Sequence, residues 1–347
     1  TERFPFGAND YYLGLIDWED KEDPIRRIIL PSLEELESNG WGRLDPSGEA
    51  LYSVENGIQH KYPDTALFLL NGLCFGRCRF CFRKLLFMEY RDYEILRDYS
   101  KAFDYIREHT EINNVLLTGG DPLRLESASL REVLAELRQI EHVQIIRIGT
   151  KSVAFNPYRI INDPELPKLI REFSTSEKRV YFMLQFNHPR EITEQAIQAV
   201  DILIKSGAIL CNQTPLIRGV NDDPEVLAEL LKKLSFIGVS PYYIFQMRPA
   251  MGNKPYVLPL VKAYQVFREA HRSISGTAKR AIFAMSHRVG KIEVVGLDEA
   301  HIYMRHHRAP DEHDSGQLII ARRNDYGYWL DDFDIVYGLE KQLCWCR

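Results

Sequence analysis

The sequence predicts an α/β fold that contains a partial barrel of six βα units, with a helical N-terminal extension and a small β-rich C-terminal segment. Six apolar, β-branched runs of strand length alternate with amphipathic helical patterns between residues 65 and 247. Near-continuous apolar strands that alternate with helices are typical of a parallel sheet. After residue 250 the pattern changes to short alternating segments, which indicates a β-rich piece that caps the barrel.

The elements follow one another in a regular order. The predicted strands cover residues 65–73, 114–121, 143–150, 179–186, 208–217 and 240–247, and the clearest helices cover 93–110, 129–140, 193–207 and 223–238. Six such units favour a full or partial TIM-type (βα)6 barrel, whose chemistry gathers at the carboxyl ends of the strands. Three regions result: an extension over 1–60, the barrel over 61–250, and a closing segment over 251–347 with a helix at 261–274 and strands at 282–285, 291–296, 301–306 and 317–323.

Composition and charge narrow the class of protein. The chain of 347 residues is 45% hydrophobic and 27% charged, which allows a buried core without disulfides. Its net charge of −5, with both signs interspersed, predicts neither a nucleic-acid partner nor an acidic membrane. We find no apolar run of about 18 residues and no signal-peptide pattern. We therefore expect a cytoplasmic protein, in which clustered cysteines bind metal or do chemistry.

Three cysteines lie within eight residues, directly after the first predicted strand. Cys74, Cys78 and Cys81 have the spacing C-x3-C-x2-C, and the other three cysteines of the chain lie far away. A structural zinc site usually takes four ligands. Three thiolates can instead hold three irons of a 4Fe–4S cluster and leave the fourth iron free to bind a small molecule through an amine and a carboxylate. A zinc site, or three buried thiols, is the alternative.

This spacing resembles the signature of radical S-adenosylmethionine (SAM) enzymes, in which an aromatic residue, here Phe80, commonly precedes the third cysteine. The resemblance implies that the open iron chelates SAM. One electron then cleaves SAM to a 5′-deoxyadenosyl radical, which removes hydrogen from the substrate. The second strand ends in Gly119, Gly120 and Asp121. A GG dipeptide alone is a common turn, but here it resembles the family's element that holds the methionine amino group.

A closer resemblance covers most of the chain, from about residue 10 to 310. The segments KYPDTALFLL, CRFCFRK, LLTGGDPL, IIRIGTK, FNHPREIT, NQTPLIRGVND and PYYIFQ occur in the order seen in lysine 2,3-aminomutase and its relatives. The resemblance implies a cluster, SAM and pyridoxal phosphate (PLP) as cofactors for migration of an amine between neighbouring carbons, with the protein supplying placement. It also implies cofactor contacts at Arg147, Asn187 and His188, and at Gln185, where the family has a histidine.

PLP requires a lysine, and the resemblance places it at Lys291. The family's glycine-rich run before this lysine is here Ser286-His287-Arg288-Val289, with only Gly290 kept, so a solvated turn lysine is the alternative.

The resemblance also implies how the PLP phosphate is held. It assigns the phosphate to Gln213 and to a basic pair that is here Lys61 and Thr65, so one arginine is missing. Arg159 is a candidate for a further positive charge, or for a surface role.

Substrate recognition departs from the lysine-specific members of the family. Arg83 matches the arginine assigned to the substrate carboxylate, with a local salt bridge as the alternative. Two aspartates that hold the far ammonium of lysine are replaced by Arg248 and Ala284. A buried ammonium without a counter-charge is costly, so we expect an anionic, amino-acid-like substrate other than lysine. Pairing of Arg248 with a carboxylate of the protein is the alternative.

The last residues are LCWCR. Cys344 and Cys346 match two of the four cysteines that bind zinc between subunits in relatives, and Asp223 stands at a third position. We expect the site to be lost, or to hold zinc with a changed ligand set, with a second iron–sulfur cluster as a further alternative. Cys211, in an apolar strand, is expected to be an inert core thiol.

These observations predict a radical SAM enzyme, an isomerase that acts as an aminomutase. The alternative keeps the radical chemistry without PLP and performs a rearrangement, oxidation or sulfur insertion on another small molecule. A non-catalytic iron–sulfur or zinc protein would require motifs at four strand ends to agree by coincidence. The expected partners are a small-molecule substrate, an electron donor such as flavodoxin or ferredoxin, and a second copy of the chain.

Overall fold

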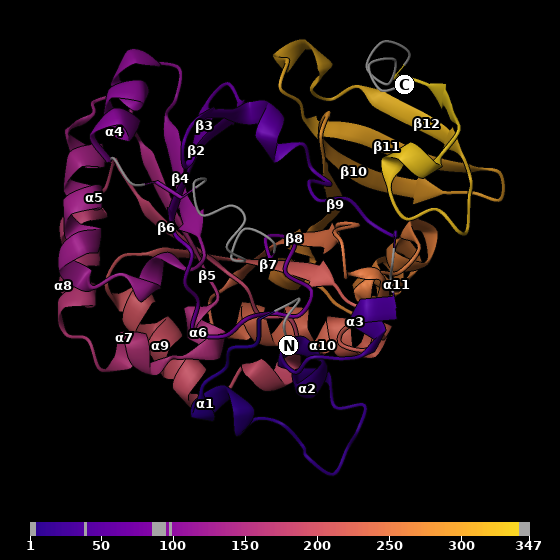
Figure 1. Cartoon of the computed structure of the whole chain (residues 1–347), viewed down its shortest axis with the longest axis horizontal. Coiled ribbons are helices and arrows are strands. Elements are labelled where there is room, and N and C mark those ends of the chain that lie inside the picture. Colours follow the sequence, from indigo (N-terminus) through magenta and orange to yellow (C-terminus); the bar gives the residue numbers. More distant parts are fainter. Residues whose placement is uncertain (1–4, 38–39, 85–94, 97–98, 340–347) are drawn as a thin grey trace.

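The computed structural model describes residues 5–37, 40–84, 95–96 and 99–339, and it is organised around one continuous sheet (Figure 1). Its 13 strands are hydrogen-bonded in the order in which they occur in the chain. They are β1 (Ser53–Glu55), β2 (Ile58–Tyr62), β3 (Thr65–Asn71), β4 (Asn114–Gly119), β5 (Ile145–Thr150), β6 (Val180–Leu184), β7 (Ile209–Leu216), β8 (Ser240–Gln246), β9 (Ile282–His287), β10 (Gly290–Leu297), β11 (His301–Arg308), β12 (Leu318–Arg322) and β13 (Ile335–Tyr337).

The strand directions divide the sheet into a parallel centre and two antiparallel flanks. Every neighbouring pair from β3 to β9 is parallel. The pairs from β1 to β3 and from β9 to β13 are antiparallel. Within the described residues β1 and β13 form the two edges, so the sheet is open.

All six predicted parallel strands are confirmed within a few residues. We predicted β9 as part of the C-terminal segment; it pairs with both β8 and β10, so it joins the parallel sheet to the antiparallel one. The prediction missed β1, β2 and β13, which are short or carry mixed polar residues.

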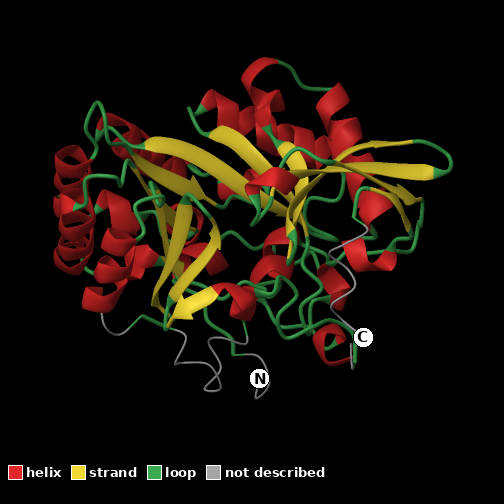
Figure 2. Cartoon of the chain, turned by 90° about the horizontal axis from the view of Figure 1, so that it is seen from above, coloured by secondary structure: helices red, strands yellow, loops and turns green. Residues whose placement is uncertain are grey.

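The long helices follow the parallel strands and cover the outer face of the sheet (Figures 1 and 2). Those that were predicted are confirmed as α4 (Tyr99–Glu108), α5 (Ser127–Gln139), α9 (Glu194–Lys205), α10 (Pro224–Phe236) and α11 (Leu260–Arg272); the predicted start of the first lies partly outside the described residues. The sequence analysis named no helix in the interval between β5 and β6, which contains Pro157, Pro164 and Pro167. It holds α6 (Ser152–Phe155), α7 (Tyr158–Ile161) and α8 (Glu165–Phe173).

The N-terminal extension holds three short helices, α1 (Asp10–Leu13), α2 (Pro24–Ile29) and α3 (Glu34–Glu37). Single 3-10 turns are η1 (Glu49–Tyr52), η3 (Pro122–Arg124), η4 (Pro189–Glu191), η5 (Lys254–Tyr256), η6 (Gly276–Arg280), η7 (Glu312–Asp314) and η8 (Leu330–Asp332). None of the described helices is long and apolar enough to cross a membrane.

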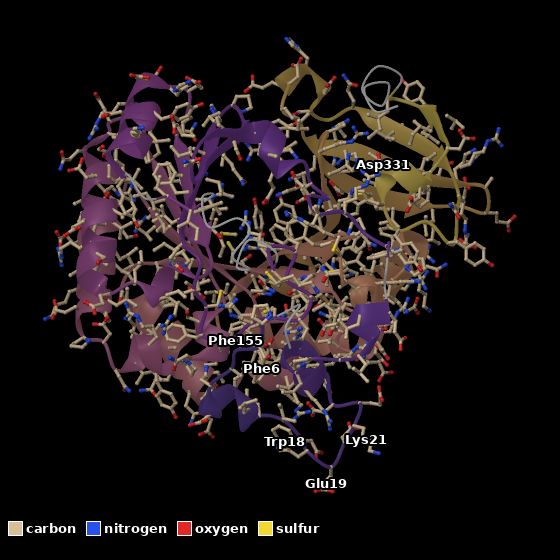
Figure 3. The ribbon with its side chains drawn as sticks, in the orientation of Figure 1. Phe6, Trp18, Glu19, Lys21, Phe155 and Asp331 are labelled. Carbon is tan, nitrogen blue, oxygen red and sulfur yellow. The ribbon has the colours of Figure 1, made fainter. Side chains whose placement is uncertain are left out.

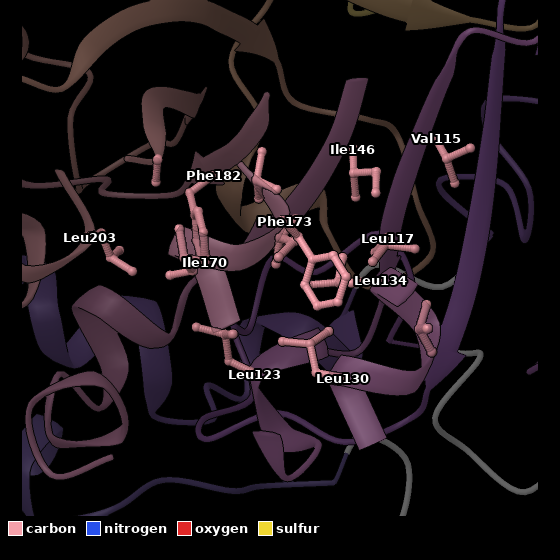
Figure 4. Close-up of a cluster of buried hydrophobic side chains, with 14 of the residues drawn as sticks. Val115, Leu117, Leu123, Leu130, Leu134, Ile146, Ile170, Phe173, Phe182 and Leu203 are labelled. Carbon is pink, nitrogen blue, oxygen red and sulfur yellow. The ribbon is translucent and has the colours of Figure 1, made fainter. Parts of the chain in front are cut away.

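Three apolar clusters stabilise the fold. One lies between the strands β3–β7 and their helices, and Figure 4 shows Leu130, Leu134, Ile146 and Phe182 meeting there. A second joins α10 and α11 to the C-terminal strands. The third packs the N-terminal extension against the cysteine segment. The predicted site residues that follow the parallel strands lie at the carboxyl ends of these strands.

Candidate active site

A cavity of about 410 Å³ opens at the carboxyl ends of the parallel strands. Its wall is built from the cysteine loop, the ends of β4, β5 and β8, and residues of β10 and β11. It brings together residues that are far apart in the sequence and were predicted to share one site. These are Cys74, Cys78, Phe80, Cys81, Arg83, Gly119, Gly120, Asp121, Arg147, Gln185, Gln213, Arg248 and Lys291.

The cysteine loop is held from below by the N-terminal extension. Arg79 donates to Glu35 through Nε at 2.9 Å and Nη2 at 2.7 Å, and both side chains are buried. Lys84 donates to the carbonyl of Arg79 at 2.9 Å, and Asn253 donates to the carbonyl of Phe80 at 2.9 Å. A bidentate, buried ion pair fixes both position and orientation. The loop that carries the thiols is therefore pre-organised.

The three thiols are half-buried in the cavity wall. Burial raises the pKa of Cys78 to about 12, although the ammonium of Lys151 acts in the opposite direction. Within the described residues, no three His, Cys, Asp or Glu side chains are placed for a single metal ion. A 4Fe–4S cluster holds its thiolates on separate irons, farther apart than the ligands of one zinc ion. Three soft thiolates on one loop fit such a cluster.

The glycines after β4 permit a close approach of backbone to backbone. A Cβ at Gly119, whose φ is 118°, would lie 2.5 Å from the carbonyl oxygen of Asn71. A Cβ at Gly120 would lie 2.3 Å from that of Leu73. Any side chain here would push the end of β4 away from the segment that leads into the cysteines. Close backbone packing therefore explains why both positions are glycine, independently of any ligand.

Asp121 ties the ends of β4 and β5 together. Its carboxylate accepts from the hydroxyl of Thr150 at 2.7 Å, from the backbone N–H of Lys151 at 2.9 Å and from that of Leu123 at 3.0 Å. Burial raises its pKa, and these hydrogen bonds act in the opposite direction. The structure accounts for the carboxylate without a ligand, so its contact with a methionine ammonium stays a prediction.

Lys151 and Glu191 form a buried ion pair that contacts the backbone of Gln185 and that the sequence analysis did not predict. Lys151 donates to Glu191 at 2.6 Å and to the carbonyl of Gln185 at 2.9 Å, and its ammonium lies 4.8 Å from the ring centre of Phe155, labelled in Figure 3. Glu191 also accepts from Tyr12 at 2.5 Å. This pair anchors the segment that carries the FNHP motif.

Asn187 and His188 lie beside the cavity and not in its wall. His188 caps the turn η4 by accepting from Arg190 at 3.2 Å. Asn187 is fully buried, and its Nδ2 has no hydrogen-bond partner in the described part of the chain. An unpaired buried amide is costly, and no described residue satisfies this donor.

Lys291 enters the cavity from the start of β10. Its ammonium lies 3.8 Å from the ring centre of Tyr243 and 5.3 Å from that of Phe245. Burial, together with neighbouring cations led by Arg147, lowers its pKa well below the usual range. The preceding Gly290, with φ 140°, passes so close to β11 that a Cβ would lie 2.4 Å from the carbonyl oxygen of Arg308. Lys291 is therefore no surface turn lysine.

An arginine that the sequence analysis did not single out lies beside Thr65. Arg308 pairs with Lys291 across β10 and β11, and both its Nη atoms lie 3.4 Å from the hydroxyl of Thr65. It also pairs with Asp64. Arg147 and Lys61 line the same end of the cavity. Position 65 and position 308 are too far apart in the chain for spacing to connect them.

Lys61 and the turn before Lys291 belong to one network. Burial lowers the pKa of Lys61 to about 7, and Lys61 donates to the carbonyl of His287. His287 and Arg288 each lie 3.3 Å from the carboxylate of Asp331 in η8. Asp331 is labelled in Figure 3. The residues that replace the family's glycines therefore fix the turn.

Arg83 and Arg248 share one carboxylate of the chain. Glu49 accepts from Arg83 at 3.1 Å and from Arg248 at 3.4 Å. The two guanidinium carbons lie 4.8 and 3.6 Å from the ring centre of Phe82. Pairing of Arg248 with a protein carboxylate was the alternative considered from sequence, and the structure shows that pair.

Other predicted positions lie elsewhere. Arg159 is outside the cavity wall and pairs with Asp163. Asp223 caps α10, accepting from Glu225 at 2.7 Å. Cys211 is a free, half-buried thiol on β7. Cys344 and Cys346 lie outside the described residues, so the expected tail site stays a prediction.

Comparison with known proteins identifies the class. A family model of the radical SAM superfamily matches residues 69–231, which include the cysteine loop and the strand ends β4–β7. The chain is a radical SAM enzyme.

Individual relatives identify the family within that class. An Aquifex aeolicus protein provisionally named L-lysine 2,3-aminomutase is 49% identical over 334 residues, which cover 96% of this chain and 88% of the relative. The L-lysine 2,3-aminomutase of Clostridium subterminale is 37% identical over 77% of this chain and 62% of its own. The glutamate 2,3-aminomutase of Clostridioides difficile is 34% identical over 80% and 64%. The chain belongs to the lysine 2,3-aminomutase family.

Proposed function

We propose that the protein is a PLP-dependent radical SAM aminomutase that moves an amine between carbons 2 and 3 of an amino acid other than lysine. One observation carries this proposal. The half-buried Lys291, whose amine has a lowered pKa, lines the same cavity as the three cysteines. A lysine with a lowered pKa is suited to a covalent bond with a carbonyl cofactor.

The cysteine end of the cavity would hold the cluster and SAM. Cys74, Cys78 and Cys81 would ligate three irons, and the unpaired amide of Asn187 and the side chain of Gln185 lie nearby as polar contacts for SAM. When bound, the cluster and SAM supply a radical that abstracts hydrogen. The protein contributes a rigid loop and a wall that excludes water. We expect the electron to come from a flavodoxin or ferredoxin.

The Lys291 end fits PLP. Its phosphate would meet Lys61, Arg308 and Gln213, which restores the charge that position 65 lacks. The rings of Tyr243 and Phe245 offer an apolar wall. When bound, PLP supplies stabilisation of the migrating centre.

Arg83 and Arg248 support a substrate with carboxylate character. They lie beside the cysteine loop, in the cavity wall, where a substrate must sit between the two cofactors. Ala284 and Arg248 occupy the positions of the two aspartates expected for lysine. Relatives act on lysine or on glutamate by their names, and this chain has no counter-charge for a second ammonium at these positions.

In this proposal the units β3–α4 to β7–α10, together with β8, form a partial barrel over residues 61–250. The extension over 1–60 supports the cysteine loop, and the segment over 251–347 closes the cavity with Lys291 and Arg308.

A PLP-independent radical SAM reaction is the second candidate. One observation favours it. His287 and Arg288, which stand where the family has glycines, both pair with Asp331 and hold the turn before Lys291 in place. A fixed turn restricts the approach of a cofactor to Lys291.

Trapping the cofactor on Lys291 separates the two candidates. Anaerobic, cluster-reconstituted protein is incubated with PLP, reduced with borohydride and digested, and the modified peptide is located by mass spectrometry. We expect label on Lys291 in the wild type, none there in Lys291→Ala, and an unchanged result in Lys262→Ala, which changes an exposed lysine of α11. Cluster absorbance without label on Lys291 would instead support the PLP-independent reaction.

A further inference from the structure

A strap formed by residues 42–52 contributes Ser47, Glu49 and Tyr52 to the cavity wall and is hydrogen-bonded to two separate segments of that wall region. On one side, Arg43 donates from its backbone to the carbonyl of Pro249 at 2.8 Å. On the other, the hydroxyl of Ser47 donates to the carbonyl of Ser286 at 2.9 Å, and that of Tyr52 to the carbonyl of Arg288 at 2.7 Å. The strap therefore spans from the exit of β8 to the turn that precedes Lys291.

The strap places one acidic side chain inside the cavity. Glu49, at the start of η1, is bonded by Arg83 through two nitrogens, Nη2 to Oε1 at 3.1 Å and Nε to Oε2 at 3.4 Å. Arg248 reaches the same Oε1 from the other side. Burial opposes the charge of Glu49, but the two arginines outweigh it, and its pKa lies below the usual value. The carboxylate is charged at neutral pH.

Arg83 and Arg248 form a binding site for a carboxylate, and the side chain of Glu49 fills this site. Nε and Nη2 form the edge of a guanidinium that matches the two oxygens of one carboxylate. Glu49 occupies that edge of Arg83, and a second carboxylate cannot pair with the same edge. Two arginines and one glutamate leave a net charge of +1, whereas removal of Glu49 would leave +2 beside one phenyl ring.

We propose that Glu49 is an internal stand-in for the carboxylate of the substrate, which displaces Glu49 from Arg83 when it binds. This inference rests on the proposed role of Arg83 in the proposed function. Displacement moves η1, and with it the hydrogen bonds of Ser47 and Tyr52 to the turn before Lys291. Glu49 thus selects for ligands whose carboxylate competes with it, and it keeps the two cations paired in the free enzyme.

The test measures occupation of the two arginines directly, in cluster-reconstituted, full-length protein without PLP. Phenylglyoxal modifies free guanidinium groups, and peptide mass spectrometry gives the rate at Arg83 and Arg248 separately. Propionate is the probe, because it has a carboxylate and no amine. In Glu49→Gln, we expect faster modification of both arginines than in the wild type. The propionate concentration that protects them by half should fall about tenfold, since a charge-assisted competitor has been removed.

Glu55→Gln is the matched control. It removes the same charge from β1, where the side chain is exposed and outside the cavity wall, and it should leave the half-protecting concentration unchanged. If Glu49→Gln does not fold, Ser47→Ala and Tyr52→Phe loosen the strap and keep the charge. Each should lower the half-protecting concentration severalfold.

Two results would overturn the proposal. The first is a half-protecting propionate concentration in folded Glu49→Gln that equals or exceeds that of the wild type. If Glu49→Gln does not fold, the same result in both Ser47→Ala and Tyr52→Phe would overturn the proposal. The other is the absence of protection by propionate in every protein, which would remove Arg83 as a carboxylate site. Neither result depends on PLP, so the Lys291 trapping experiment decides the proposed function independently.

Discussion

The two ends of the cavity differ in how the chain balances their charges. At the cysteine end, buried charges have partners within the protein: Arg79 with Glu35, and Lys151 with Glu191. At the Lys291 end, Lys61, Arg147 and Arg308 converge on Lys291, and the nearby acid Asp64 is partly exposed. Like charges that crowd together lower the pKa of a lysine and favour an anion. The cations named at the first end are paired with buried carboxylates, whereas the second end keeps an excess of positive charge.

The largest expected effect tests the cysteine end. Cys78→Ala should abolish formation of 5′-deoxyadenosine from SAM under reducing conditions, because the cluster loses one of three thiolates. The product is measured by liquid chromatography, with iron content in parallel. Cys211→Ala, which removes a free thiol of β7, should keep both. Product formation at the wild-type rate in the Cys78 variant would remove the cluster from the proposed mechanism.

The support beneath the cysteine loop gives the next effect. Glu35→Gln leaves Arg79 buried without its counter-charge, which should lower the free energy of unfolding by about 3–5 kcal/mol. Denaturant unfolding measures the loss, and reconstitution should bind less iron. Glu37→Gln changes an exposed carboxylate on the same helix and should cost under about 0.5 kcal/mol. Equal stabilities of the two variants would show that the buried pair does not hold the loop.

The sequence predicted the cysteine end of the cavity better than the Lys291 end, because the two ends are assembled from the chain in different ways. The cysteine spacing, the GG pair and the strand ends lie in short contiguous segments, so pattern alone predicted six strands and placed the thiols correctly at the end of β3. The other end is assembled from β2, β5, β10 and β11, and only tertiary structure brings Arg308 to Thr65. Glu49 was missed for the same reason, because a lone glutamate in a loop carries no spacing signal.

Removal of the positive charge of Arg308 tests whether the Lys291 end of the cavity binds an anion. Arg308→Met should weaken PLP binding about tenfold, since a charge-assisted hydrogen bond contributes about 1.5–3 kcal/mol. Absorbance titration of the cofactor gives the dissociation constant without turnover. Arg305→Gln, on the same strand but paired with Glu293 outside the cavity, is the control and should bind PLP normally. If both variants bind equally, Arg308 has no part in the phosphate site.

The smallest effect is a pH dependence. The pKa of Lys61 is lowered to about 7 in the folded protein, below its unfolded value, so the folded state binds fewer protons. Its contribution to stability therefore rises as pH increases from about 7 toward the unfolded pKa of the lysine, and it stays constant below about 7. Thermal unfolding at pH 6 and pH 9 without phosphate should differ less in Lys61→Met than in the wild type. An identical pH difference in the two proteins would contradict a crowded cationic site.

The contacts of the cysteine loop also set the order in which the protein can mature. Its backbone carbonyls accept from Asn253 and, through Lys84, the loop reaches the carbonyl of Gly252, about 170 residues later in the chain. During synthesis, which proceeds from the N-terminus, the three thiols leave the ribosome long before these partners exist. The contacts of the loop are therefore complete only after residues 252 and 253 have been made and have folded against it. Delivery of iron and sulfide to the finished loop would follow that step.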